Sequence, residues 1–205
     1  MLPHPFIVQI YSKEKDNMIQ NEQFIKQSRL EDQAHKLLNE RGVRLEDIAK
    51  VVYDLQKNYV SNLTLDYCLE NVIAVMKKRE VQNAVITGIE IDIAAEKGLF
   101  SPILNDLLMR DEGLYGIDEI LVLSIVNVYG SIGLTNFGYV DKLKPGIIGK
   151  LNDTKDEHCN TFIDDVVGAL AAAAASRIAH AQPQLDEVSE NPSPQSSYQE
   201  TRDNQ

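Results

Sequence analysis

The segment 117–128 most constrains the fold, because a helix over it is apolar on every side except at Asp118, Glu119, Ser124 and Asn127. A helix that lacks a polar face is stable in water only when other elements surround it. The segments before and after it repeat apolar residues at helical spacing, and none alternates convincingly in the manner of a β-strand. The sequence therefore predicts an all-α protein, a compact multihelical bundle with a central buried helix surrounded by others.

Start and stop signals place the other helices. Thr64 and Ser101-Pro102 are typical of residues that begin helices, Gly42 of one that ends them, and Pro145 predicts a break. Helices are expected over 29–41, 45–59, 65–77, 79–96, 101–109 and 117–128, as two short ones within 136–151, and from Asn160 or Thr161 to about residue 180.

The two ends of the chain differ from its middle. Residues 1–27 show no sustained periodicity, and residues 182–205 are rich in Pro, Ser, Gln, Asn and acid with little to bury. We predict a flexible N-terminal arm over 1–27, a single helical domain over 28–181 and a disordered acidic and polar tail over 182–205. Cys68 and Cys159 lack the spacing of a zinc site, so reduced thiols in the cytoplasm are expected.

The charge of the chain excludes some partners. It has 20 Lys and Arg against 31 Asp and Glu, a net charge of −11, which repels phosphate backbones and anionic lipid surfaces. Nucleic acid is therefore not expected as a partner. No apolar run of the roughly 18 to 20 residues needed to cross a bilayer stands out, so membrane contact is expected to be at most peripheral, at the inner face.

Acidic residues embedded in apolar sequence mark a candidate site: Asp118 and Glu119, Asp141, and Asp164 with Asp165. A buried carboxylate needs a partner, a hydrogen bond or a metal. Clustered carboxylates suit Mg²⁺, which keeps several waters and is completed by substrate phosphate. The alternative is structural, because acids near helix starts stabilise the first turn through the helix dipole.

Two lysines and one glycine near these acids are compatible with either a functional site or a purely structural role. Lys142 and Lys144 bring positive charge beside Asp141, where they hold a phosphoryl group, neutralise the acid or simply lie on the surface. Gly168, inside the last helix, costs about 1 kcal/mol relative to alanine. That cost suggests that a backbone, an ion or a ligand approaches there.

Three short motifs resemble those of a known family. The order DEI from Asp118, DKLKPGII from Asp141 and IDDVVGA from Ile163 is similar to the pattern of the phosphatidylglycerophosphatase A superfamily. The segments DEGLYGIDEI, SIVNVYGSIG, TNFGYVDK and KPGI resemble its soluble branch, known as YutG-like or low-temperature-requirement C proteins. The sequence departs from the family pattern at Ile147, where the family has a second proline, and in the order Gly168-Ala169.

The resemblance implies a compact fold with one central helix and a Mg²⁺-dependent phosphatase that converts phosphatidylglycerophosphate to phosphatidylglycerol. Carried over to this sequence, it implies Asp118 and Lys144 as catalytic residues, with Lys144 orienting the phosphate. It also implies metal ligands drawn from the remaining acids of the motifs: Glu119, Asp141, Asp164 and Asp165.

Other functions stay open at this stage. One alternative is a non-catalytic interaction or regulatory protein of the same fold involved in growth at low temperature. Another is an enzyme acting on a different phosphorylated substrate, such as a small phosphate ester or a nucleotide. The apolar helix over 117–128 and the small residues of the last helix also predict a homo-oligomer, a dimer or a tetramer.

Overall fold

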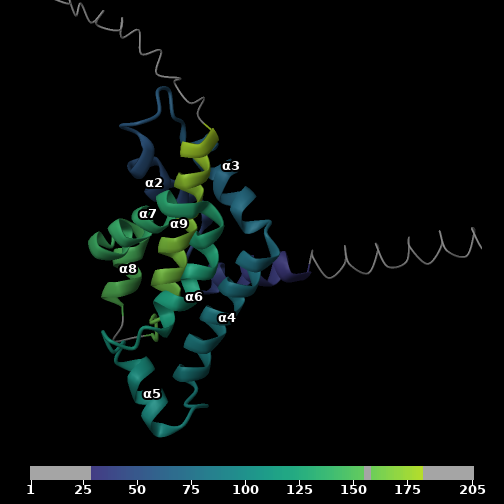
Figure 1. Ribbon diagram of the computed structural model, residues 1–205. Coiled ribbons are helices and arrows are strands. Elements are labelled where there is room, and N and C mark those ends of the chain that lie inside the picture. Colours follow the sequence, from purple (N-terminus) through teal and green to yellow (C-terminus); the bar gives the residue numbers. More distant parts are fainter. Residues whose placement is uncertain (1–28, 155–157, 182–205) are drawn as a thin grey trace, which may run out of the picture.

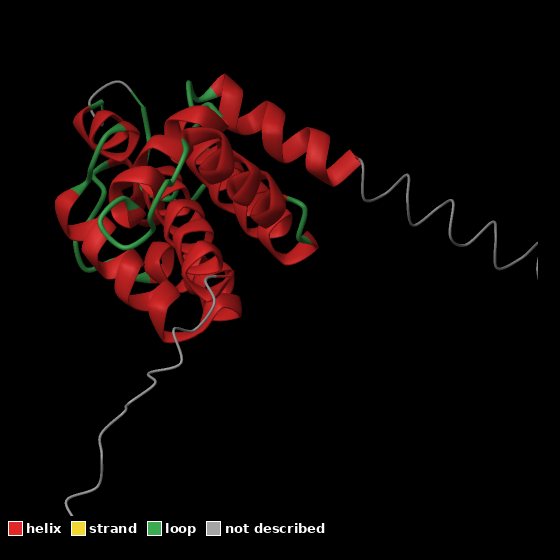
Figure 2. Cartoon of the chain, turned by 90° about the horizontal axis from the view of Figure 1, so that it is seen from above, coloured by secondary structure: helices red, strands yellow, loops and turns green. Residues whose placement is uncertain are grey.

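The computed structural model describes residues 29–154 and 158–181, and every regular element in these ranges is a helix (Figures 1 and 2). The predicted arm and tail lie outside the described residues. A helix over 29–40 precedes the others. They are α2 (Leu45–Gln56), α3 (Leu65–Met76), α4 (Arg79–Glu96), α5 (Pro102–Met109), α6 (Ile117–Val126), the 3₁₀ turn η1 (Asn127–Tyr129), α7 (Gly130–Leu143), α8 (Ile147–Asp153) and α9 (Ile163–Ala181).

The central helix is α9, and α2, α3, α4, α6, α7 and α8 all pack against it (Figure 1). Every residue from Ile163 to Ser176 is buried. Its alanines allow neighbours to approach from all sides, because a small side chain keeps the distance between helix axes short. The all-α bundle with a central helix is thus confirmed.

The assignment of the central helix to 117–128 is wrong. In α6, Val122, Ile125 and Val126 are buried, but Ile117 is 54% and Ile120 62% exposed. Hydrophobicity alone misled the prediction, because this helix lies on the surface of the described chain with an uncovered apolar side.

The first turn of α9 is capped from α4 and not by Asn160 or Thr161, as the sequence suggested. The carboxylate of Asp92 accepts hydrogen bonds from the backbone N–H groups of Phe162 and Ile163, at 3.0–3.2 Å. The Thr161 hydroxyl instead donates to the Leu108 carbonyl. A side chain far away in sequence therefore satisfies N–H groups that a helix cannot pair internally.

The helix ends agree in part with the start and stop signals of the sequence. Thr64 caps α3, since its hydroxyl accepts from the Tyr67 N–H. Ser101 precedes α5 but makes no side-chain capping bond. The break before Pro145 is confirmed: Lys144 ends α7 in the left-handed conformation, with φ 44°. The helix ahead of it begins at residue 130, earlier than the predicted 136.

Gly168 lies against α7. A Cβ at this position would lie 3.5 Å from Val140 and 3.6 Å from Phe137, both on α7. These are ordinary van der Waals distances, so an alanine would fit at this position. The side chains of α7 lie beside Gly168, but their packing does not by itself require a glycine there.

The stretch Ile117–Leu143 is long and apolar enough to cross a membrane by length and composition, contrary to the expectation that no such stretch stands out. In a straight helix its residues Asp118 and Asp141 would be about 35 Å apart, at 1.5 Å per residue. Both line one pocket in the folded chain. The stretch is therefore folded back at η1, as two helices against α9, and does not run as a single span.

Candidate metal centre

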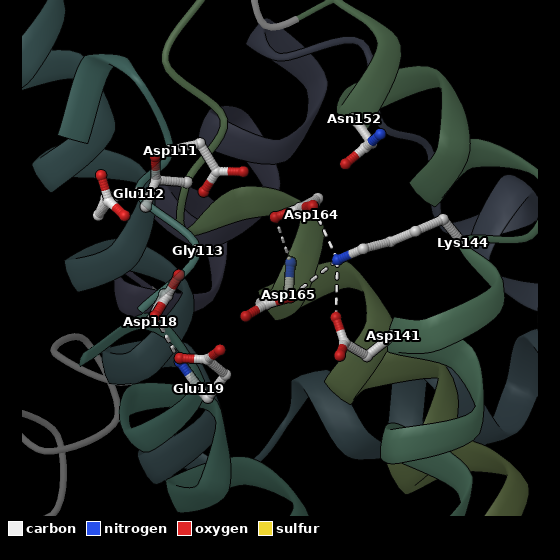
Figure 3. A pocket seen from close by; sticks show the side chains of 11 residues that line it. Asp111, Glu112, Gly113, Asp118, Glu119, Asp141, Lys144, Asn152, Asp164 and Asp165 are labelled. Carbon is white, nitrogen blue, oxygen red and sulfur yellow. Dashed lines mark hydrogen bonds and ion pairs between the residues drawn. The ribbon is translucent and has the colours of Figure 1, made fainter. Parts of the chain in front are cut away.

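The site residues predicted from the three motifs lie together in one pocket beside the first turn of α9 (Figure 3). Its volume of about 130 Å³ is smaller than the 300 Å³ or more typical of sites that enclose a whole organic ligand. The pocket therefore has room for an ion with its waters and a phosphoryl group. Its lining comprises Asp111, Glu112, Gly113, Asp118, Glu119, Asp141, Lys144, Asn152, Thr161, Asp164 and Asp165.

Three carboxylates form the part of the pocket best suited to a cation. Asp118 and Glu119, from the start of α6, and Asp165, from the start of α9, each offer an oxygen within 4.8 Å of the others. Glu119 Oε2 is buried and has no hydrogen-bond partner among the described residues. An unpaired carboxylate oxygen inside a protein is costly, so its position fits a metal ligand.

Burial and neighbouring carboxylates raise the pKa values of two members of this triad. Burial, and then the adjacent Glu119 carboxylate, raise the pKa of Asp118 to about 7. Burial, and then Asp164, raise the pKa of Asp165 to about 8, against the opposing effect of Lys144. Without a cation, carboxylates so close together cannot all ionise at neutral pH.

Lys144 organises the other side of the pocket. Its ammonium donates to Asp141 at 2.7 Å, Asp164 at 3.0 Å and Asp165 at 3.2 Å (Figure 3). Burial opposes its charge, but the carboxylates of Asp164, Asp141 and Asp165 outweigh that effect and raise its pKa. Lys144 is therefore a fixed positive charge, and Asp165 belongs both to its shell and to the carboxylate triad.

The backbone explains how Lys144 comes to this position. The left-handed conformation at Lys144 ends α7, and the following Pro145 prevents the helix from continuing. The lysine thereby lies at the C-terminal end of α7, while Asp164 and Asp165 lie in the first turn of α9. Two residues distant in sequence meet because α7 packs along α9.

The sequence did not assign Asp111, Glu112, Asn152 or Thr161 to the site, although all four line the pocket. Asp111 and Glu112 follow α5 in a polar connection, where acids are common on any protein surface. Asp111 has a positive φ of 48°, but that conformation is visible only in the folded chain, so the sequence itself carried no signal for this residue. The pocket thus holds one lysine among more acids than the motifs supplied.

The fold and the pocket define the class of this protein. Its described residues form an all-helical bundle, and a carboxylate-rich site that includes one partly buried lysine lies beside the start of the central helix. The sequence model described as Phosphatidylglycerophosphatase A matches residues 44–180. The chain belongs to this family. Membership points in general to phosphatase chemistry.

Relatives and solved structures agree with the branch of YutG-like and low-temperature-requirement C proteins. The chain is 55% identical over 163 residues to the protein YutG of Bacillus subtilis, spanning 80% of this chain and 96% of that one. A crystal structure of the low temperature requirement C protein from Listeria monocytogenes is 59% identical, with a TM-score of 0.72, covering 74% and 95%. The structure of YpjQ from Bacillus subtilis is 55% identical, with a TM-score of 0.70, covering 75% and 95%.

Proposed function

We propose that this protein is a Mg²⁺-dependent phosphatase that hydrolyses phosphatidylglycerophosphate to phosphatidylglycerol and phosphate. The observation that carries the proposal is the convergence of three motifs on one pocket, with an unpaired Glu119 oxygen inside it. Family membership supports the phosphatase class. Cytoplasmic localisation, with contact only at the inner face of the membrane, belongs to the same proposal.

In this proposal one set of residues binds the metal and another binds the phosphate. Asp118, Glu119 and Asp165 hold Mg²⁺, which accepts carboxylate oxygens and keeps several waters. The bound ion would neutralise phosphate charge and supply a nucleophile at neutral pH. Lys144 contacts a phosphoryl oxygen as a point charge, and Asp141 and Asp164 fix its ammonium in place. This division adds Asp118 to the ligands implied by the resemblance and gives Asp141 and Asp164 to the lysine.

Phosphate release tests the proposal directly. The purified chain is incubated with phosphatidylglycerophosphate in detergent micelles, with Mg²⁺ or with EDTA, and inorganic phosphate is measured. We expect release only with Mg²⁺. Glycerol 3-phosphate serves as the soluble comparison. Release from glycerol 3-phosphate alone would indicate a small phosphate ester as the substrate instead of a lipid. No release from either compound would favour a non-catalytic regulatory protein of the same fold.

Mg²⁺ should stabilise the protein more at pH 8.5 than at pH 6. The raised pKa values of Asp118 and Asp165 mean that the folded chain holds protons that the unfolded chain has released above the ordinary value of 3.8. Without metal, stability therefore falls as the pH rises from about 4 through about 8. Mg²⁺ replaces those protons, so its effect grows over the same interval.

Thermal unfolding with and without Mg²⁺ measures this effect. At a Mg²⁺ concentration one hundred times the dissociation constant at pH 8.5, the expected gain in the free energy of unfolding at that pH is roughly 2.7 kcal/mol. The same Mg²⁺ concentration should give a smaller gain at pH 6. Ca²⁺ at equal concentration provides a comparison of ion size. An equal gain at both pH values would contradict binding by the triad.

A further inference from the structure

The predicted self-association needs a surface, and the structure shows where one lies. The small residues of α9 are not available, since Ile163 to Ser176 are buried within the chain itself. The exposed sides of α6 and α7, which pack beside each other and against α9 (Figure 1), carry large apolar side chains interspersed with uncharged polar ones such as Ser131 and Thr135. We define the uncharged face by six exposed residues: Ile120, Val128, Ile132, Leu134, Gly138 and Tyr139.

The uncharged face differs in charge from the rest of the molecule. No Asp, Glu, Lys, Arg or His occurs from Leu121 to Val140, although 25% of the chain is charged and its net charge is −11. Five large side chains on it are 38–62% exposed. The central parts of protein interfaces are likewise depleted in charge and rich in apolar and aromatic groups.

Gly138 supplies an independent observation. It lies within α7 on the side of Leu134, one helical turn away, and is exposed. A Cβ added there would meet no atom within 4 Å. Glycine in a helix interior costs about 1 kcal/mol relative to alanine, and nothing within the described chain requires it. A glycine on an exposed helix side lets the backbone of another helix approach closely.

We propose that the uncharged face is the interface between two copies of this chain, with Gly138 at the closest approach of α7 to the partner. A second copy suits the face better than an anionic bilayer, because the acidic chain is repelled by anionic lipid as a whole. The six residues of the face carry no charge, so two acidic copies would meet there on uncharged side chains, with the Asp54–Lys57 ion pair beside Tyr139 at its edge. Acyl chains, moreover, have no need of a glycine.

Gly138→Gln separates this proposal from a free surface because the two predict opposite results. In an isolated chain the new side chain meets no neighbour, so α7 is stabilised and the oligomeric state is unchanged. In a pair of copies it blocks the approach. We expect the full-length wild type to be oligomeric by sedimentation velocity at micromolar concentration. Gly138→Gln should weaken association by roughly tenfold or more, with no loss of helical circular dichroism.

Leu134→Gln, 44% exposed on the same face, is the second variant and should also weaken association. Leu65→Gln on α3, 48% exposed outside the face, is the matched control and should not. A monomeric wild type would overturn the proposal, as would an oligomer that both face variants leave intact. A monomer that co-sediments with phosphatidylcholine vesicles through these residues would assign the face to a bilayer instead.

Discussion

Asp165→Asn is expected to reduce Mg²⁺-dependent phosphate release by roughly 100-fold or more, the largest effect among single substitutions in the pocket. Asp165 is both a member of the triad with Asp118 and Glu119 and a partner of Lys144 at 3.2 Å. The amide keeps the shape of the side chain but loses the charge that holds the cation. Steady-state kinetics over a Mg²⁺ titration measure the loss.

The controls distinguish a lost site from a lost fold. Asp106→Asn removes an exposed carboxylate that pairs with Arg110 on the surface of α5 and should leave activity unchanged. Circular dichroism should show that Asp165→Asn stays folded, and titration calorimetry should show weakened Mg²⁺ binding. Full activity with unchanged Mg²⁺ affinity would remove Asp165 from the site and, with it, the proposed ligand set.

Much of the candidate site was predictable because its residues stand out from their surroundings. Asp164 and Asp165 lie in the first turn of a long apolar helix, and Asp118 and Glu119 in the first turn of another. Acids there need a structural or functional reason. The sequence could not show that Lys144 contacts three carboxylates from two helices, because that arrangement depends on how α7 and α9 pack.

The fold was predictable in class but not in its centre. Apolar content pointed to the helix over 117–128, whereas the structure places the alanine-rich α9 inside. Alanine contributes little to hydrophobicity scales, yet its small size lets several helices approach one axis at once. The prediction that the helix over 117–128 is buried on every side was also wrong, because Ile117 and Ile120 are exposed. An apolar helix can leave one side uncovered for another molecule.

Asp92 was missed, although a signal was present. It lies three residues after Ile89 and seven after Val85, so it falls on the buried stripe of α4 and not on its polar side. Its pKa is raised to about 8, chiefly by burial, against the bonds donated by Phe162 and Ile163. An acid on an apolar stripe predicts a buried partner, but the identity of that partner requires the structure.

Asp92→Ala is therefore expected to lower the free energy of unfolding by about 2–4 kcal/mol. The change leaves the backbone N–H groups of Phe162 and Ile163 buried without an acceptor. It also removes the carboxylate that the Cys159 thiol contacts at 3.5 Å. Since the freed turn carries Asp164 and Asp165, Mg²⁺ affinity should fall as well. Urea unfolding with and without Mg²⁺ measures both losses.

Asp92→Asn separates the acceptor from the charge. The amide oxygen can still accept from the first turn of α9, so the loss should be smaller than for alanine. The native carboxyl has a folded pKa of about 8 against an ordinary value of 3.8. The folded chain therefore retains a proton that the unfolded chain loses, and the contribution to stability declines as the pH rises between these values. The asparagine variant should lack this part of the decline. If its stability falls with pH as steeply as that of the wild type, the decline arises in the metal pocket and not at Asp92.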